Sequence, residues 1–160
     1  MAGHGTVISI HIAPTGAAPM KSVTNAKVVA GRGLEGDRYY SKLGTYSNQA
    51  GSGRDVTLIE IEAIDALKRD YEVDLDANRS RRNIVTQGIP LNHCVEKEFR
   101  IGDVVLRGTR LCEPCAHMEK LTVKGAMRGL VHRGGLRAEI ISGGSICVGD
   151  TIQFQAPTAR

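Results

Sequence analysis

The sequence predicts a mainly β fold, a β barrel with a few short helices, built as a single domain over residues 1–160. The chain has 160 residues and 41% hydrophobic content, which is enough for one domain with a substantial core. It contains 19 Gly but only four Tyr, two Phe and no Trp, a composition that argues against a helical bundle. Many short apolar segments, separated by turn-forming residues, favour a barrel.

The first half of the chain predicts three strands and one helix. Ile8, Ile10 and Ile12 alternate with polar neighbours, which is the period of a half-buried strand. Apolar residues between positions 61 and 71 instead recur with the spacing of an amphipathic helix. The predicted strands are 6–12, 23–30 and 56–59, the predicted helix is 60–71, and a polar loop rich in Gly and Tyr occupies 31–53.

The second half predicts further short strands and one weak helix. Gly-Asp pairs at 102–103 and 149–150 interrupt apolar segments, as a tight turn between strands requires. Gly125 and Gly129 weaken the helical pattern of residues 119–131. The predicted strands are 83–86 and 99–106, followed by a closing hairpin of strands 136–141 and 146–154 around a turn at 143–145.

Charge and composition narrow the classes of ligand and location. Lys plus Arg total 21 against 17 Asp plus Glu, a formal charge of +4. This mild surplus favours an anionic small ligand, and the chain lacks the basic block of a nucleic-acid tail. The N-terminal residues lack the pattern of a secretory signal, and no apolar run reaches the roughly 18 residues that span a bilayer. With four Cys and no such signal, we expect reduced thiols, a cytoplasmic location, and neither nucleic acid nor membrane as a partner.

Residues 31–36 (GRGLEG) match the dinucleotide fingerprint G-x-G-x-x-G, and Asp55 follows at the spacing of a ribose partner. That function requires a helix directly after the glycines, and the sequence after Gly36 predicts none. A glycine-rich turn at the barrel rim is the favoured interpretation. In a third interpretation the loop presents Arg38 to an anion, with the segment after Tyr40 mobile.

Residues 112–115 (CEPC) form a C-x-x-C motif. Structural zinc would require further ligands beside this pair. The candidate zinc set is Cys94, Cys112, Cys115 and His117. Thioredoxin-like redox chemistry requires a strand and a helix around the motif, which the β-rich context does not favour. A positively charged neighbourhood would make one of these thiols a better nucleophile and metal ligand. We interpret Cys94 and Cys147 as buried and inert.

Arginines occur at places in the sequence that a barrel can bring together. A basic cluster at 79–82 immediately precedes a predicted strand, where side chains can point into the barrel mouth. Arg133 lies in a second basic turn, flanked by glycines. Arg binds phosphate and planar carbonyl groups with two parallel N–H donors. We therefore predict one anion site in which Arg38, Arg81 and Arg133 converge near Cys115.

Four sequence segments follow one another in a specific order. They are GLEGDRY at 33–39, RRNIVTQG at 81–88, CEPC at 112–115, and RGG at 133–135 followed by GGSICVGD at 143–150. Together they resemble the MOSC domain family, named for the C-terminal domain of molybdenum-cofactor sulfurase, and the resemblance covers nearly the whole chain. It implies a short, stand-alone member with a barrel like the small β-barrel domain of pyruvate kinase, in agreement with the strand pattern.

The resemblance also implies a cofactor and the residues that bind it. The molybdenum cofactor, in which a phosphorylated pyranopterin holds molybdenum through a dithiolene, is the implied ligand. Cys115 matches the family cysteine that ligates the metal or carries sulfur. Arg81 and Asn83 match residues that hold the pterin in related amidoxime-reducing enzymes, and Arg38 matches a segment assigned to cofactor binding. Arg133 joins this set from the basic turn. Pyridoxal phosphate binding is a further family-level expectation.

Three functions follow as alternatives. The first is a molybdenum-cofactor-dependent oxidoreductase that reduces small N-hydroxylated substrates. The four cysteines of the chain do not have the spacing that an iron–sulfur cluster requires, so its electrons would come from a separate donor protein. The second is a carrier of sulfur or of the cofactor, with a persulfide on Cys115 and no substrate turnover. The third is a zinc- or anion-binding module without catalysis.

Overall fold

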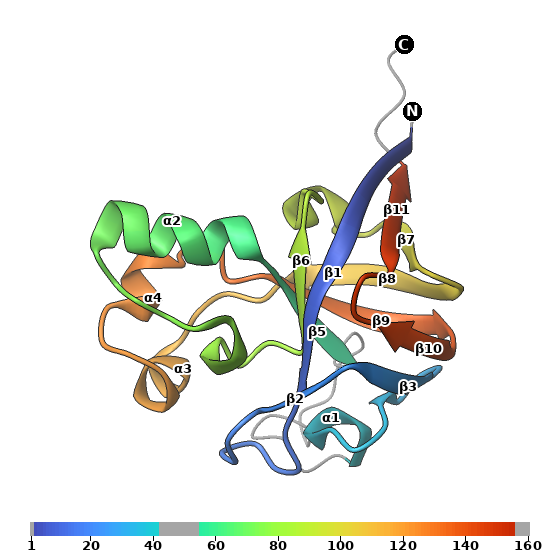
Figure 1. The fold of residues 1–160 in the computed structure, drawn as a ribbon, viewed down its shortest axis with the longest axis horizontal. Helices are drawn as coiled ribbons and strands as arrows, with labels where there is room; N and C mark the ends of the chain where they lie inside the picture. The colour runs from blue at the N-terminus through green and yellow to red at the C-terminus, as the bar shows by residue number, and fades with distance from the viewer. Residues whose placement is uncertain (1, 42–54, 156–160) are drawn as a thin grey trace.

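The computed structural model describes residues 2–41 and 55–155 and shows a β barrel with helices on one side (Figure 1). In this described part, seven strands form a closed sheet, because β1 (Ala2–Ile12) pairs with both β11 (Thr151–Gln155) and β6 (Ile84–Gln87). The predicted barrel is therefore confirmed. From β11 the other strands follow in the order β7 (Glu98–Ile101), β8 (Val104–Leu111), β9 (Leu136–Ser142) and β5 (Val56–Glu60).

Shorter elements surround this barrel. The strand β2 (Lys21–Val23) adds to β1, and a small second sheet has the order β10 (Gly144–Cys147), β3 (Asn25–Val29), β4 (Gly33–Leu34). The helices are α1 (Arg38–Ser41), α2 (Ile61–Tyr71), α3 (Ala116–Leu121) and α4 (Ala126–Gly129), with 3-10 turns η1 (Ala77–Arg79) and η2 (Leu91–Cys94). Within residues 2–41 and 55–155, no helix has the length and apolar character needed to cross a membrane.

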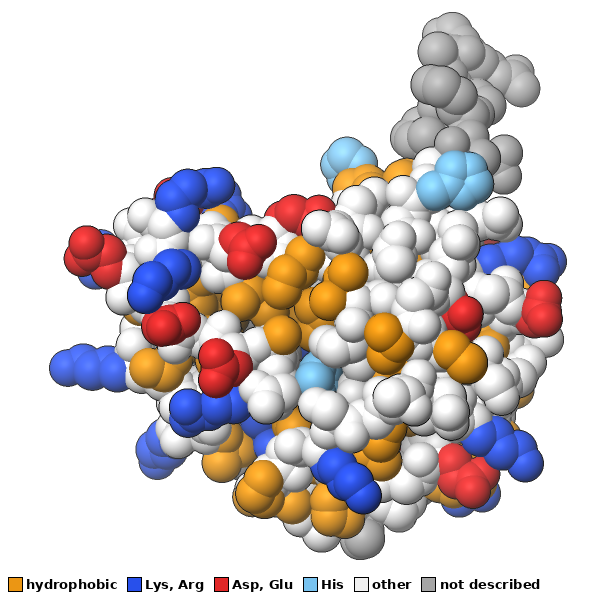
Figure 2. All heavy atoms as spheres, viewed as in Figure 1, with side chains coloured by type: hydrophobic (Ala, Val, Ile, Leu, Met, Phe, Trp, Pro, Cys, Tyr) orange, Lys and Arg blue, Asp and Glu red, His pale blue; other side chains and the backbone are white. Residues whose placement is uncertain are grey.

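Alternation along β5 and β6 divides the apolar side chains between two cores. Leu58 and Ile84 lie in the core inside the barrel. Their neighbours Ile59 and Val85 lie in a second core. They share it with Leu67 of α2, Met118 of α3 and Leu130, which directly follows α4. Figure 2 shows hydrophobic side chains gathered between α2 and β1, where barrel and helices meet. The second core thus holds α3, and the cysteine loop before it, against the barrel.

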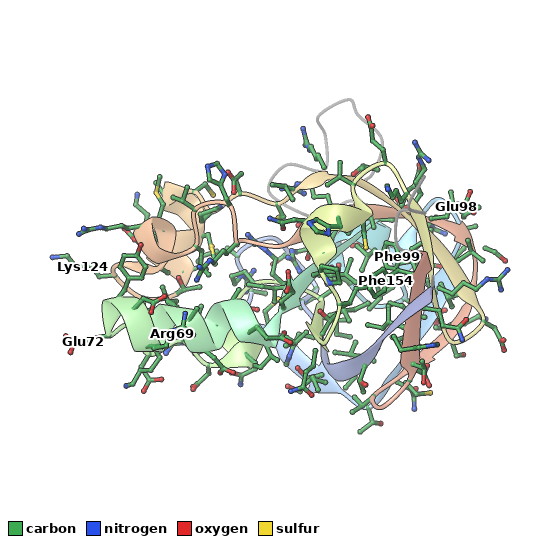
Figure 3. All side chains as sticks on the ribbon, turned by 90° about the horizontal axis from the view of Figure 1, so that it is seen from above. Arg69, Glu72, Glu98, Phe99, Lys124 and Phe154 are labelled. Carbon is green, nitrogen blue, oxygen red and sulfur yellow. The ribbon has the colours of Figure 1, made fainter. Side chains whose placement is uncertain are left out.

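The two ends of the molecule differ in character (Figure 3). Phe99 of β7 pairs with Phe154 of β11 at the barrel end. Glu72 and Lys124 lie at the opposite, helical end, where charged side chains of both signs are exposed. At the barrel end two large aromatic side chains therefore pack into the core, although charged residues such as Glu98 are exposed there too.

The helix predicted over 119–131 is wrong, because this segment contains parts of two helices. Gly125, with a φ of +95°, precedes α4 and separates it from α3. A Cβ atom at Gly129 would lie 2.0 Å from Cδ1 of Leu67, so a larger residue here would force the Leu67 side chain to move, and glycine lets α4 pack closely on α2. The two glycines that weakened the predicted helix are thus the residues that break it and let it pack.

The predicted closing hairpin of 136–141 and 146–154 is also wrong. The strand β9 pairs with β5 and β8, whereas β10 pairs with β3 and β11 pairs with β1 and β7. At Gly143 a Cβ atom would lie 2.5 Å from the carbonyl oxygen of Val28. This close approach carries the chain across to the second sheet instead of reversing it onto β9. The Gly-Asp turn at 102–103 is confirmed, and it divides the strand predicted at 99–106 into the antiparallel pair β7 and β8.

Acidification is expected to weaken the fold through His11. This side chain is 2% exposed, with Nε2 2.8 Å from Oγ of Ser9 and Nδ1 3.1 Å from Oγ of Ser22, and so joins β1 to β2. Burial lowers the pKa of His11 below its usual 6.5. The unfolded chain therefore binds the proton more readily than the folded chain, and the free energy of unfolding should fall as the pH drops through about 6.5.

Urea unfolding at about pH 7 and about pH 5 measures this effect. The His11→Gln variant is the control, because its side chain does not titrate in this range, and it should lose less stability on acidification than the natural protein. Equal losses in both proteins would contradict the prediction.

Candidate functional site

A small cavity lies where the loop after β8 meets α3. Its volume is about 60 Å³. Both cysteines of the C-x-x-C motif line it, together with arginines from α1, from the segment before β6 and from β9. We call it the cysteine–arginine cavity. The residues that determine its chemistry are Cys112, Cys115, Arg38, Arg81, Arg82 and Arg137.

Cys115 occupies the position immediately before α3. Its backbone is extended, with φ −140° and ψ 170°, and its Sγ accepts a hydrogen bond from the backbone N–H of Met118 at 3.5 Å. The thiol is free and half-buried, whereas that of Cys112 is free and buried. A deprotonated thiol at Cys115 would be a ligand for a soft metal or a nucleophile.

The glycines at 134 and 135 allow a close contact that positions the cysteine loop. A Cβ atom at Gly134 would lie 2.3 Å from the carbonyl oxygen of Cys112. One at Gly135, which has a φ of +112°, would lie 2.0 Å from the carbonyl oxygen of Leu58. The backbone N–H of Cys112 also donates to the carbonyl of Gly135 at 2.7 Å. The two glycines therefore allow the 133–135 turn to pack between the backbone of Cys112 and that of Leu58 in β5.

Backbone carbonyls hold Arg38 and Arg81 in the cavity wall. Arg38 donates to the carbonyl of Arg81 at 3.1 Å and pairs with the buried carboxylate of Asp37 at 3.1 Å. Arg81 donates to the carbonyls of Gly16 and Ala18, in the loop between β1 and β2, at 2.6 and 2.5 Å. These bonds fix the two guanidinium groups but leave the charge of Arg81 without a carboxylate in this set of partners.

Arg82 connects the loops on either side of the cavity. It is 6% exposed, its Nε donates to the carbonyl of Gly134 at 2.6 Å, and its Nη2 donates to the carbonyl of Cys112 at 3.1 Å. Arg82 thus stabilises the contact between the cysteine loop and the 133–135 turn while adding a buried positive charge.

Arg137, in β9, carries a polar atom that needs a ligand. Its Nη1 is buried and has no hydrogen-bond partner among the described residues. Burial opposes the charge of Arg137, but the neighbouring Cys112 and Tyr39, and then Cys115, outweigh it and raise the pKa of this guanidinium. Arg137 is therefore positively charged, and its buried N–H group lacks an acceptor. An anion in the cavity would supply one.

The cavity carries an excess of positive charge. Among the described lining residues there are four arginines but one carboxylate, that of Glu113. His132 engages both oxygens of this carboxylate, with Nδ1 2.8 Å from Oε2 and the backbone N–H donating to Oε1 at 2.8 Å. Burial, and then the charge of Arg38, lower the pKa of Arg81, a sign that the arginines repel one another. The arrangement favours a bound anion.

The structure brings together three of the five site residues predicted from the sequence: Arg38, Arg81 and Cys115. The prediction that Arg133 converges on Cys115 is wrong. Arg133 lies outside this cavity, with Nη1 3.7 Å from Oδ2 of Asp70 and half of its side chain exposed. The reason is the turn itself, which directs the carbonyl of Gly134 toward Arg82 and leaves Arg133 beside α2.

Asn83 follows the cavity arginines in sequence, but its side chain is fully buried in the barrel wall. Its Oδ1 accepts from the backbone N–H and the hydroxyl of Thr57 at 3.0 and 3.1 Å. Its Nδ2 donates to the carbonyl of His11 at 3.1 Å. These bonds join β1 and β5 to the start of β6. The cofactor-binding role of Asn83 stays a prediction, beside this structural one.

Sequence reasoning missed Arg82 and Arg137 as site residues. Arg82 was noted only as part of the basic cluster. Arg137 lies between Leu136 and Ala138, both fully buried, in a strand that the sequence predicted. A charged residue between two buried apolar positions of a strand is the signal that could have identified it.

The glycine motif at 31–36 builds a turn and β4, in agreement with the favoured interpretation. A Cβ atom at Gly33 would lie 2.2 Å from the carbonyl oxygen of Asp55. The carboxylate of Asp55, the candidate ribose partner, instead accepts from the backbone N–H of Ile140 at 2.8 Å. The prediction that no helix follows the glycines was wrong, because the short helix α1 begins at Arg38. The segment after Tyr40, residues 41–53, was predicted to be mobile. Ser41 is the last residue of α1, and residues 42–53 lie outside the described residues.

The remaining cysteines differ from each other. Cys94 is buried as expected, and burial raises the pKa of its thiol to about 11. Cys147 is exposed, so its expected burial is wrong; it lies in β10, where three of the four residues are exposed. No group of three or more His, Cys, Asp or Glu side chains in the described part of the chain could hold a metal ion. The side chain of His117, from the candidate zinc set, is outside that part.

Known proteins share this fold. A profile of the MOSC domain matches residues 45–153. The YuaD protein from Bacillus subtilis is 16% identical, with a TM-score of 0.80 over 96% of each chain. YiiM from Geobacillus stearothermophilus is 13% identical, with a TM-score of 0.69 over 94% of this chain and 75% of that one. YiiM from Escherichia coli is 16% identical, with a TM-score of 0.65 over 100% of this chain and 72% of that one. No curated protein sequence matches the chain.

Proposed function

This chain belongs to the MOSC domain family, and from that premise we propose that it binds the molybdenum cofactor at the cysteine–arginine cavity. The observation that carries the proposal is a free, half-buried thiol beside four arginines, one of which has a buried N–H group without an acceptor. The family is linked to this cofactor, which combines a metal that accepts thiolate ligands with an anionic phosphate.

The donor set fits such a group. Cys115 offers a thiolate to the molybdenum, and the four arginines offer N–H donors to the oxygens and to the phosphate. With a volume of about 60 Å³, the cavity has room for one small anionic group and not for a whole pterin. The rest of the cofactor would therefore extend beyond the cavity.

We assign the reaction to reduction of an N-hydroxylated compound. The N–O bond breaks, two electrons and two protons enter, and the products are the amine or amidine and water. Bound molybdenum supplies the two-electron chemistry, and a separate donor protein supplies the electrons. The residues of this chain hold the cofactor: Cys115 through its thiolate, and Arg38, Arg81 and Arg137 through their positive charges.

A carrier function is the second candidate. It is favoured by the presence of two free thiols, Cys112 and Cys115, in one cavity. In this function Cys115 holds a persulfide or an intact cofactor, passes it to another protein, and turns over no substrate. The positive charge around the thiol would stabilise a persulfide anion as it would a thiolate.

Metal and sulfur analysis distinguishes these functions. The protein would be purified from a host that makes the cofactor and assayed for molybdenum, zinc and labile sulfane sulfur. Molybdenum near one atom per chain is expected for the cofactor-binding enzyme. Sulfane sulfur without molybdenum would favour the carrier, and zinc alone would overturn both.

A further inference from the structure

A second hollow adjoins the cysteine–arginine cavity. Its volume is about 310 Å³, and it lies between the loop that follows β1, the turn η1 and the end of α3. Its apolar lining is Ala17, Pro19, Met20 and Leu121. We call it the loop–α3 groove. Ala17 and Pro19 are exposed, while Met20 and Leu121 are half-buried, so apolar surface remains open to solvent here.

The groove and the cavity are neighbours. Arg81 and Leu121 line both of them, so the two spaces lie on either side of these side chains. The bonds from Arg81 to the carbonyls of Gly16 and Ala18 hold that boundary in place and also fix the loop that forms one groove wall. A ligand too large for the cavity would therefore reach the groove by passing Arg81 and Leu121.

The cavity and the groove differ in their share of charged and apolar lining residues. The cavity has four arginines and the unsatisfied Nη1 of Arg137. In the groove, four apolar residues line the walls, the polar lining residues are Asn78, Arg79 and Arg81, and no carboxylate is among the described lining residues. Arg79 turns Nη2 toward the carbonyl of Thr122 at 3.2 Å, and Arg81 is held by Gly16 and Ala18. An apolar body would gain from leaving water against the apolar walls.

We propose that the cavity and the groove form one elongated site for an amphiphilic anion, with the oxyanion end beside Arg137 and an apolar body against Leu121. This deepens the proposed function and rests on it only for the use of the cysteine–arginine cavity. It specifies that the ligand is anionic on the cavity side of Arg81 and apolar on the groove side. The residues that would contact the apolar body are Leu121, Ala17, Pro19 and Met20.

Isothermal titration of the full chain with three probes tests this. Inorganic phosphate carries only the anionic end, 1-naphthol only the apolar body, and 1-naphthyl phosphate both. We expect 1-naphthyl phosphate to bind at least about tenfold more tightly than phosphate, because burial of apolar surface in a fitted pocket has effects of this size. The Arg137→Gln variant should weaken both phosphate-containing probes.

Groove variants separate the two ends. Leu121→Asn should remove most of the advantage of 1-naphthyl phosphate over phosphate. Ala17→Asn, at an exposed position that lines the groove and not the cavity, should reduce this advantage while leaving the affinity for phosphate unchanged. Val148→Asn, at an exposed apolar residue outside both spaces, is the matched control and should change nothing. Equal affinities for 1-naphthyl phosphate and phosphate, or an advantage that both groove variants retain, would overturn the proposal.

The outcome is independent of the metal assay. If 1-naphthyl phosphate follows the expected pattern in protein that retains no molybdenum, the elongated site stands and the proposed cofactor function fails. If molybdenum is retained but the groove variants have no effect on the probe, the proposed function stands and the elongated site is overturned.

Discussion

Replacing Cys115 by serine is expected to abolish molybdenum retention, whereas Cys112→Ser should retain most of it. A hydroxyl is a far poorer ligand than a thiolate for a metal that accepts sulfur. Cys115 is the half-buried thiol of the pair, while Cys112 is 2% exposed and its backbone is held by Gly135 and Arg82. Mass-spectrometric metal analysis of both variants, purified from a cofactor-producing host, measures the difference.

The same two variants should affect stability in the opposite order. At Cys115, serine can accept the hydrogen bond from the N–H of Met118, and serine is a favoured residue before the first turn of a helix. At Cys112 a hydroxyl would be buried in place of a thiol, at a cost of about 1 kcal/mol or more. We therefore expect Cys115→Ser, the variant that retains no molybdenum, to have a higher free energy of unfolding than Cys112→Ser. Equal molybdenum loss in both would point to a shared zinc site or a disulfide and would refute the assignment to Cys115.

The elements of the barrel are predictable because each obeys a local period. The alternation of Ile8, Ile10 and Ile12 specifies a strand wherever that strand is placed, and the same holds for the helical spacing of Ile64 and Leu67 in α2. Which strands pair with each other cannot be predicted from such a local period. Whether residues after Gly143 fold back on β9 or cross to β3 depends on space near the carbonyl of Val28, which lies more than a hundred residues away in the sequence.

The site residues likewise divide into those that local motifs identify and those that depend on the path of the chain. Motif spacing identified Cys115, Arg38 and Arg81, and all three line one cavity. It did not separate Arg133 from Arg137, because the two arginines stand on either side of one glycine pair and differ in whether they lie before β9 or within it. Arg133 precedes the glycines that approach Cys112 and Leu58, and it faces Asp70. Arg137 follows them within the strand, and so reaches the cavity.

Asn83→Ala is expected to lower the free energy of unfolding by about 3 kcal/mol, since three side-chain hydrogen bonds in a fully buried site would be lost. The partners left behind, on Thr57 and His11, belong to β5 and β1, so the loss weakens two junctions of the closed sheet at once. Urea unfolding of protein without cofactor measures this directly. Arg133→Ala is the control, because an exposed ion pair such as that with Asp70 contributes at most about 1 kcal/mol.

This measurement separates the two roles of Asn83. If its main role were to bind the pterin, Asn83→Ala would reduce molybdenum content while the stability of the cofactor-free protein stayed within about 0.5 kcal/mol of the natural value. If its role is to join the strands, stability falls before any cofactor is added, and molybdenum loss follows only to the extent that the protein unfolds. The buried position of Asn83 and the hydrogen bonds made by both its Oδ1 and its Nδ2 favour the second result. A stable Asn83→Ala protein without molybdenum would contradict it and assign this residue to the cofactor.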